Sequence, residues 1–231
     1  MTSPQPADPD DDPGALRSYG GEAGADRVAR RRAALIDAAL ELLGGEGAAG
    51  AVTVRGVCRQ AGLTARYFYE SFPSAEDLVA KTFDTVIAEI ATGGLAAFET
   101  GVDVEDKVGL AVGAIVDVID ADRRKGRLLF SQSLQSPTVA VKRMESTALF
   151  AMLTLQTASG IFDVEPGPEA LAAVHFQVGG LARLLAAWLE GEFEMERDAV
   201  VATSVRLLLA VGDLVARHEP GFNPTPGPND V

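Results

Sequence analysis

Residues 53–72, TVRGVCRQAGLTARYFYESF, decide the fold of this chain, because they predict two short helices separated by a tight turn. Thr53 suits the position before a helix, since its hydroxyl can accept a hydrogen bond from a free N–H of the first turn. Gly62 tolerates the positive φ at which a helix stops, and Thr64 is placed to cap a second helix. The apolar residues of the first helix recur at helical spacing and give it one buried face: Val54, Val57, Cys58 and Ala61.

This arrangement has the geometry of a helix-turn-helix DNA reader, in which the first helix lies across the phosphate backbone and the second enters the major groove. Arg66 can donate two hydrogen bonds to guanine or clamp a phosphate, and Tyr67 and Tyr69 carry hydroxyl groups on rigid rings. We expect Arg66 and Tyr67 at or beside bases, and the other contacts mainly at the DNA backbone. The expected DNA-binding residues are Thr53, Arg55, Thr64, Ala65, Arg66, Tyr67 and Tyr69.

Periodicity alone does not single out DNA binding, because any two short helices separated by a glycine give the same pattern. Residues 62–78, GLTARYFYESFPSAEDL, resemble the signature of the TetR family of bacterial transcription regulators. The matching positions are a turn glycine, a capping threonine, a tyrosine late in the second helix and an F-P-S-x-E-x-L step: Gly62, Thr64, Tyr69, Phe72, Pro73, Ser74, Glu76 and Leu78. The resemblance is specific over residues 27–83. It departs at Ala75, where the family often has a phosphate-binding lysine, and at Ala48, which replaces an aromatic residue.

The composition of the chain limits the classes of protein to which it can belong. The chain has 231 residues, 47% of them hydrophobic, which is enough for a substantial core. Its single cysteine excludes an intrachain disulfide, and its two histidines lie far apart with no cluster at metal-ligand spacing, so we expect neither a metal nor another cofactor. The acidic start and the lack of an apolar run near 18 residues predict neither a secretory signal nor a membrane partner. A cytoplasmic protein is expected.

A net charge of −13 argues against nucleic-acid binding until its distribution is considered. Residues 26–82 carry eight basic and seven acidic side chains, whereas residues 83–231 carry eleven basic and twenty-one acidic ones. The basic residues of the first segment cluster in RVARRR, residues 27–32, and in the helix-turn-helix stretch. Only the proposed reader therefore escapes the acidic excess, and its RVARRR arginines are candidates for phosphate contacts.

The predicted fold class is all-α, because helical periodicity recurs along the chain and strand alternation does not persist. We expect a disordered acidic, Pro-rich tail over residues 1–25, a three-helix DNA-binding domain over 26–73, a helical ligand-binding and dimerisation domain over 74–218, and a disordered tail over 219–231. Pro73 and Ser74 are expected to open a long helix that continues to about Phe98. The following helices are predicted over residues 104–121, 123–135 with an interruption at Gly126, 139–159, 168–191 and 196–217.

The last two predicted helices carry apolar residues around more than one face, so a second copy of the chain is needed to bury them. The family resemblance implies the same, since these helices form a four-helix dimer bundle in that family. The expected dimer interface comprises Val178, Leu181, Leu185, Trp188, Val205, Leu208 and Leu209.

A small, mostly apolar effector is expected between the long helix and the segments from 104 to 185, which are rich in Phe and Met. The candidate lining residues are Phe98, Phe130, Phe150, Met152, His175 and Phe176, although each could equally be ordinary core. Gly109 and Gly113 favour close helix packing over ligand space. The resemblance implies a homodimer that binds a palindromic double-stranded DNA operator and is released by the effector, with a repressor favoured over an activator.

Two other classes of protein compete with this prediction. An enzyme is disfavoured, because the chain has no G-x-S-x-G, phosphate-binding glycine loop or H-E-x-x-H motif, and Cys58 and His175 fit a core better than a reactive site. An all-α dimer that binds a small molecule or protein but no longer reads DNA stays open, because of Ala75 and the acidic total. Loss of DNA affinity with rising salt separates a reader from a non-reader.

Overall fold

The computed structural model describes residues 19–46, 51–131, 134–162 and 167–216, and all regular structure within them is helical. The helices are α1 (Tyr19–Gly44), α2 (Val54–Ala61), α3 (Ala65–Ser71), α4 (Ala75–Thr100), α5 (Val104–Ala121), α6 (Arg123–Phe130), α7 (Pro137–Phe162), α8 (Pro168–Leu189) and α9 (Arg197–Ala216). The predicted all-α class is confirmed.

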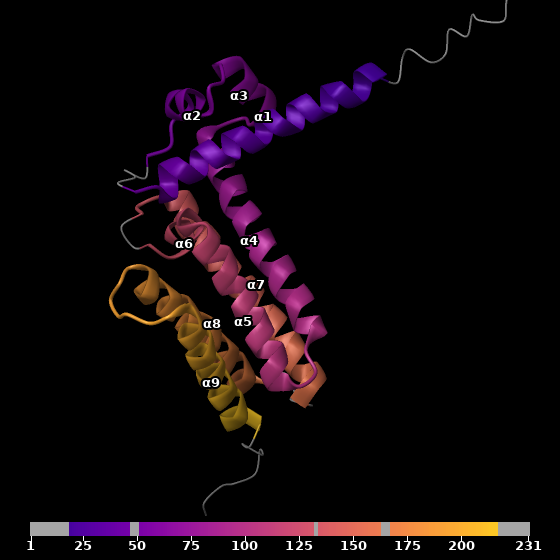
Figure 1. Ribbon diagram of the computed structural model, residues 1–231, viewed down its shortest axis with the longest axis vertical. Helices are drawn as coiled ribbons and strands as arrows, with labels where there is room; N and C mark the ends of the chain where they lie inside the picture. The colour runs from indigo at the N-terminus through magenta and orange to yellow at the C-terminus, as the bar shows by residue number, and fades with distance from the viewer. Residues whose placement is uncertain (1–18, 47–50, 132–133, 163–166, 217–231) are drawn as a thin grey trace, which may run out of the picture.

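The first three helices form one end of the molecule, with α2 and α3 lying on α1 (Figure 1). They pack around a small apolar core, to which α2 contributes Val57 and Cys58 of its predicted buried face. This core consists of Leu35, Ala38, Ala39, Val57, Cys58, Phe68, Phe72 and Leu78. Leu78 belongs to α4, so the first turn of this helix completes the core of α1 to α3 before the rest of the helix extends into the body.

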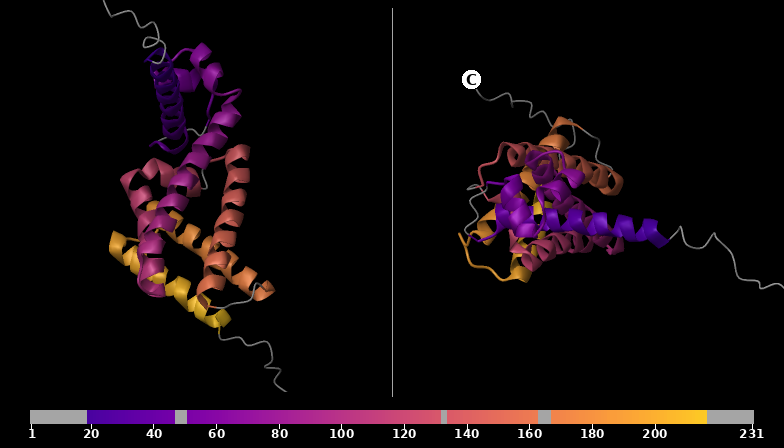
Figure 2. Two further views of the ribbon diagram at one scale, coloured as in Figure 1. Left: turned by 90° about the vertical axis from the view of Figure 1, so that its right-hand side faces the viewer. Right: turned by 90° about the horizontal axis from the view of Figure 1, so that it is seen from above.

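Helix α4 leads away from the reader and runs alongside α5, while α6 to α9 complete the body (Figures 1 and 2). Ser74 caps α4: its hydroxyl accepts from the Asp77 amide at 3.1 Å and donates to the Asp77 carboxylate at 2.8 Å. Pro73 lies before this cap, so the expectation that it occupies the first turn is wrong. An acidic first turn stabilises the positive end of the helix dipole.

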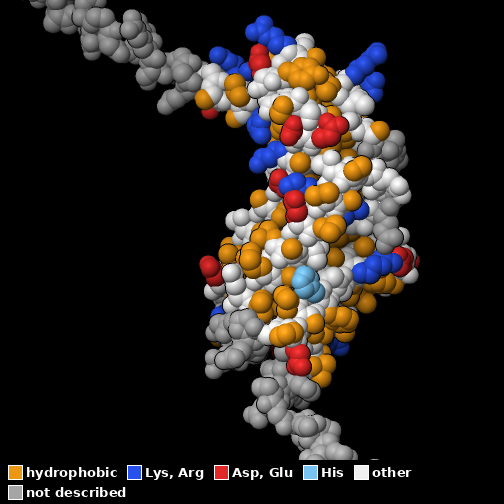
Figure 3. Space-filling model, turned by 180° about the vertical axis from the view of Figure 1, so that it is seen from behind, with side chains coloured by type: hydrophobic (Ala, Val, Ile, Leu, Met, Phe, Trp, Pro, Cys, Tyr) orange, Lys and Arg blue, Asp and Glu red, His pale blue; other side chains and the backbone are white. Residues whose placement is uncertain are grey.

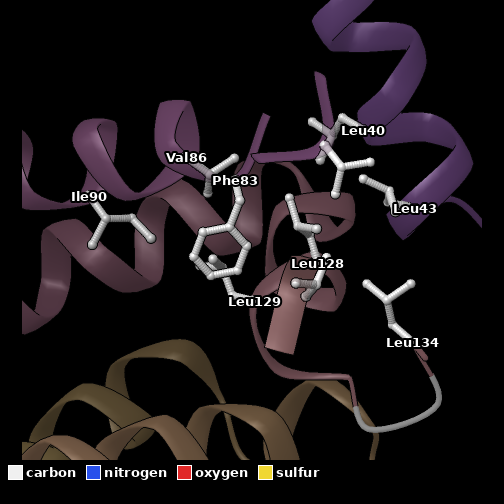
Figure 4. Close-up of a cluster of buried hydrophobic side chains, with 10 residues drawn as sticks. Leu40, Leu43, Phe83, Val86, Ile90, Leu128, Leu129 and Leu134 are labelled. Carbon is white, nitrogen blue, oxygen red and sulfur yellow. The ribbon is translucent and has the colours of Figure 1, made fainter. Parts of the chain in front are cut away.

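A second apolar cluster joins the reader to the body (Figure 4). Leu40 and Leu43 from α1 meet residues of α4, α6 and α7 there, all of them nearly inaccessible to solvent. The remaining members are Val79, Phe83, Val86, Ile90, Leu128, Leu129, Leu134 and Val139. The cluster crosses the expected boundary at residue 73, so α4 and α6 pack directly against α1.

Several predicted helix bounds need correction. Helix α1 begins at Tyr19, so residues 19–25 are helical; the rest of the predicted N-terminal tail and the C-terminal tail lie outside the described residues. Helix α6 ends at Phe130 and is not interrupted at Gly126, which is buried where a Cβ would overlap side chains of Leu189 and Ile119. Gly126 therefore serves close packing. The bounds of α5 match the prediction.

Candidate functional site

The helix-turn-helix forms as its sequence indicates. The Thr53 hydroxyl accepts from the Gly56 amide at 3.1 Å, and Gly62 adopts φ 65°, the left-handed conformation in which the chain turns out of α2. The Leu63 amide then donates to the Cys58 carbonyl at 2.9 Å and closes the turn. Thr64 precedes α3 with extended backbone, but its side chain makes no capping hydrogen bond, so that part of the prediction is wrong. Its exposed hydroxyl stays available for another partner.

Helix α3 presents one face to its own domain and one to solvent. Phe68 is fully buried, whereas Ala65, Arg66 and Tyr69 are exposed on the outer side together with Thr64. The Arg66 side chain is 83% exposed, and its Nε donates to Glu70 Oε1 at 3.0 Å. Glu70 was not among the predicted site residues, although its spacing of four residues from Arg66 on one helix predicts such a pair. Arg66 is thus extended along α3 with its charge partly balanced.

Two arginines of the RVARRR cluster hold α3 in place. The Arg31 guanidinium lies 4.3 Å from the centre of the Tyr67 ring and 3.8 Å from Glu70, and Arg32 donates to the Ser71 carbonyl at 2.6 Å. Arg32 also stacks on the ring of Phe72 at 4.2 Å. Neither arginine is therefore free for the phosphate contact that was expected, and Tyr67 is half-buried. These tertiary contacts leave no trace in the sequence pattern.

Other cations at this end remain available. Arg27, Arg55 and Arg59 are exposed and make no ion pair within the described part of the chain. Figure 3 shows Lys and Arg side chains gathered at the end of the molecule that carries α1 to α3, with hydrophobic side chains more frequent over the body. The reader therefore offers exposed Thr53 and Arg55 from the start of α2 beside Arg66 and Tyr69 from α3.

The body contains a partly open cavity of about 350 Å³ lined by residues of α4, α5, α6, α7 and α8. Phe130 and Phe150, two of the predicted lining residues, are in its wall. A second cavity of about 360 Å³ continues between α4, α5, α7, α8 and α9 and includes the predicted Phe98. The two share wall residues, namely Ile90, Ile115, Phe150, Thr154, Val178 and Leu181. Each volume lies within the range of small-molecule sites.

The other three predicted lining residues were placed wrongly. Met152 and Phe176 are 51% and 70% exposed, and His175 is also exposed on α8. None of the three is in the wall of either cavity. The error arises because α7 and α8 carry apolar residues on their outer faces as well as on their inner ones, and composition does not tell these faces apart.

Arg143 of α7 is the half-buried charge in the first cavity's wall. Its Nη2 donates to the carbonyls of Leu128 at 2.9 Å and Ser131 at 2.8 Å, at the C-terminal end of α6. Its Nε is buried without a hydrogen-bond partner. Burial lowers the pKa of this guanidinium from its usual range, because the charged form is less well solvated. Arg143 was not among the residues predicted from the sequence to line the cavity.

The expected dimer residues are largely used within one chain. Leu185 and Val205 are buried in a core cluster with α5, Val178 and Leu181 line the cavities, and Leu208 and Leu209 pack against the same cluster. Trp188 is half-buried, and its indole N–H donates to the Met195 carbonyl at 2.8 Å. Leu185 and Val205 are therefore core residues of the single chain, whereas the other five keep part of their surface exposed, and their place in a dimer interface stays a prediction.

A different face of α8 and α9 is open to solvent. It combines large apolar side chains with small residues that permit close helix approach: Leu171, Ala172, Phe176, Gly179, Gly180, Ala202, Leu207, Ala210 and Leu214. Among the described helices, α8 alone has the length and apolarity of a membrane span, with 28% of that window buried in the structure. Partner helices of a soluble bundle meet the same two criteria.

The fold and the site define a class: an all-α protein with a helix-turn-helix at one end and a ligand-sized cavity in a helical body. Residues 35–82 match the family model for bacterial regulatory proteins of the tetR family. This match covers the helix-turn-helix, and the fold of the described chain resembles solved structures of tetR-family regulators.

Three solved structures illustrate the likeness in fold. The fatty acid degradation regulator FadR from Bacillus halodurans is 19% identical with a TM-score of 0.63, covering 78% of this chain and 94% of that one. A tetR-family regulator from Streptomyces coelicolor is 18% identical with a TM-score of 0.62, covering 82% and 83%. FadR from Bacillus subtilis in complex with stearoyl-CoA is 16% identical with a TM-score of 0.58, covering 77% and 97%. No curated protein matches the sequence of this chain.

Proposed function

We propose that this regulator is a cytoplasmic homodimeric repressor that binds a palindromic DNA operator and is released by a small, mostly apolar ligand. Residues 26–73 would read the operator, and residues 74–218 would bind the ligand and form the dimer. The observation that carries the proposal is that α4 and α6 each belong both to the cavity wall and to the apolar cluster that holds α1. A change at the cavity therefore acts on the helices that position the reader.

The proposed operator contacts are solvent-exposed side chains in and just before α2 and α3. Arg66 is the candidate for a base contact, because its long side chain is almost fully exposed early in α3. Thr53, Arg55 and Tyr69 are exposed around it and suit phosphate contacts, and exposed Thr64 and Ala65 complete the same surface. Tyr67 takes a lesser part, since Arg31 covers its ring and leaves it half-buried. Tyr69→Phe should weaken binding to all sequences alike.

Dimerisation would use the solvent-exposed face of α8 and α9 described above. Burial of Leu171, Phe176, Leu207 and Leu214 against a second copy removes four large apolar side chains from water. The glycine and alanine positions between them allow the helices of the two chains to approach closely. A two-fold axis there places one reader on each side, so two half-sites one helical turn apart, about 34–36 Å, can be contacted together.

Two helices would carry the release signal. Helix α4 lends Phe83, Ile87 and Ile90 to the cavity while its first turn closes the reader core. Helix α6 lends Leu129 to the cavity while Arg124, at its other end, binds α1 through Asp37 at 3.0 Å and Glu41 at 3.1 Å. A ligand that is accommodated only after α4 or α6 shifts would change the separation of the readers and lower operator affinity.

The effector is proposed to be apolar over most of its surface, because the walls of both cavities are mainly aliphatic and aromatic side chains. The structural likeness to a regulator solved with stearoyl-CoA supports a ligand with an apolar chain. Reciprocity then requires operator DNA to weaken effector binding by the same factor as the effector weakens operator binding.

Selection of bound sequences from random DNA tests the reader. A palindromic consensus, bound by a dimer with an affinity that falls linearly with salt on logarithmic axes, is the expected result. Absence of any DNA binding at low salt would favour the alternative, a dimeric ligand-binding protein that does not read DNA. Measuring effector affinity with and without the selected operator then tests release, since equal values would exclude that compound as an inducer.

A further inference from the structure

We propose that the effector is an amphipathic anion, with its apolar chain along the two joined cavities and its acidic head at Arg143. The inference rests on the proposed function in one respect, that the cavities hold the effector. It adds the charge class of the ligand and the residue that recognises it.

The sign of charge around the cavities is opposite to that of the protein. The whole chain has 33 acidic and 20 basic side chains, yet neither cavity has an Asp or Glu among the described residues of its wall. The first cavity instead has two arginines, Arg143 and Arg183. A site that excludes carboxylates in a protein this acidic attracts anions and repels cations.

Arg143 is the arginine whose charge is left uncompensated. Its hydrogen bonds go to two neutral carbonyls, and no carboxylate pairs with it anywhere in the described ranges of the chain. The neighbouring hydroxyls of Ser146 and Thr147 donate back to the Arg143 carbonyl, so they add no negative charge. A half-buried cation without a counter-ion is costly, and a bound anion removes that cost.

Arg183 differs from Arg143 in both respects. Its side chain is half-exposed and already pairs with Glu192, so its charge is balanced and solvated. Arg183 is the more exposed of the two, whereas Arg143 is half-buried beside the end of α6. The two arginines therefore give a test position and a matched control on the same cavity.

The position of Arg143 also links binding of the effector's acidic head to release of the operator DNA. Its Nη2 donates to the last carbonyls of α6, the helix whose other end binds α1 through Arg124. An acid that takes up the N–H groups of Arg143 competes with these carbonyls for the same donor. Loosening the C-terminal end of α6 then reaches the reader through the shared apolar cluster.

Titration calorimetry on the full-length protein with three twelve-carbon probes, dodecanoate, dodecanol and dodecylamine, tests the charge class. All probes are kept below their micelle concentrations at pH 7. We expect dodecanoate to bind about tenfold or more tighter than dodecanol, and dodecylamine to bind most weakly. The preference for the acid should vanish in Arg143→Gln, whose amide can still donate to a carbonyl, and persist in Arg143→Lys and in the control Arg183→Gln.

The outcomes distinguish the effector site itself from the anionic class of the effector and from the role of Arg143. Equal binding of the acid and the alcohol by the wild type overturns the anionic class and leaves the apolar effector site standing. An acid preference that survives in Arg143→Gln overturns the assignment of Arg143. Failure of both the acid and the alcohol series from eight to sixteen carbons to bind overturns the effector site together with this inference. The wild-type comparison holds even if Arg143→Gln does not fold.

Discussion

Replacement of Arg124 by glutamine is expected to weaken the joint between the reader and the body. Arg124 is bound by Asp37 and Glu41 of α1 and by Asp122, with N–O distances of 3.0, 3.1 and 2.8 Å. The Asp37 and Glu41 side chains are 67% and 41% exposed, so each pair contributes about 0–1 kcal/mol. The less exposed Asp122 pair adds about 1–2 kcal/mol. The free energy of unfolding should therefore fall by about 2 kcal/mol.

Urea unfolding, followed by far-ultraviolet circular dichroism at one protein concentration, measures this loss. Arg123→Gln is the matched control, because the neighbouring Arg123 is exposed and has a single 3.5 Å pair with Asp120. It should change the free energy of unfolding by less than about 0.5 kcal/mol. Equal losses in the two variants would refute the argument that the α1–α6 joint depends on Arg124.

The pH dependence gives a second readout of the same contact. The hydrogen bond from Arg124 holds the pKa of Asp122 below its usual range. A carboxyl whose pKa is depressed by folding stabilises the folded state above its unfolded pKa of about 3.9, and this stability is lost as pH falls through the folded pKa. Stability should thus fall as the pH drops below about 4 in the wild type, and less steeply in Arg124→Gln.

Further predictions concern the reader, the dimer and the core. Arg66→Ala should cost about 1–3 kcal/mol of operator binding and relax base preference in a gel-shift series; equal loss on every sequence would make Arg66 a phosphate contact. Glu70→Gln removes the acid that pairs with Arg66, so DNA affinity should rise at low salt, and an unchanged affinity would place Glu70 away from the DNA. Phe176→Glu should raise the dimer dissociation constant in sedimentation experiments, whereas an unaffected dimer would exclude this face of α8. Phe83→Ala, at a fully buried position, should lower the free energy of unfolding by about 3–5 kcal/mol, and a loss below 1 kcal/mol would contradict its place in the joining cluster.

Local structure in the reader could be predicted from the sequence because it depends on near neighbours. The Thr53 cap, the left-handed Gly62 and the start of α3 are each set by residue types within a few positions. The bounds of α5 also lie at such local signals, since Asp103 caps its start and Asp122 follows its last residue. Thr64 is the exception, since the hydrogen bond that its type favours is not formed.

What the sequence by itself determined was the all-α class, the helix-turn-helix and the resemblance to the TetR family, since these depend on caps, turns and periodicity within short stretches. Only the tertiary structure decided which apolar face of α7, α8 and α9 is turned inward, and so moved Met152, His175 and Phe176 from the cavity to the surface. It also showed Arg31 stacked on Tyr67 and Arg143 bound to the end of α6. The physical reason is that periodicity records how apolar each face of a helix is, whereas the partner of that face comes from residues distant in the chain.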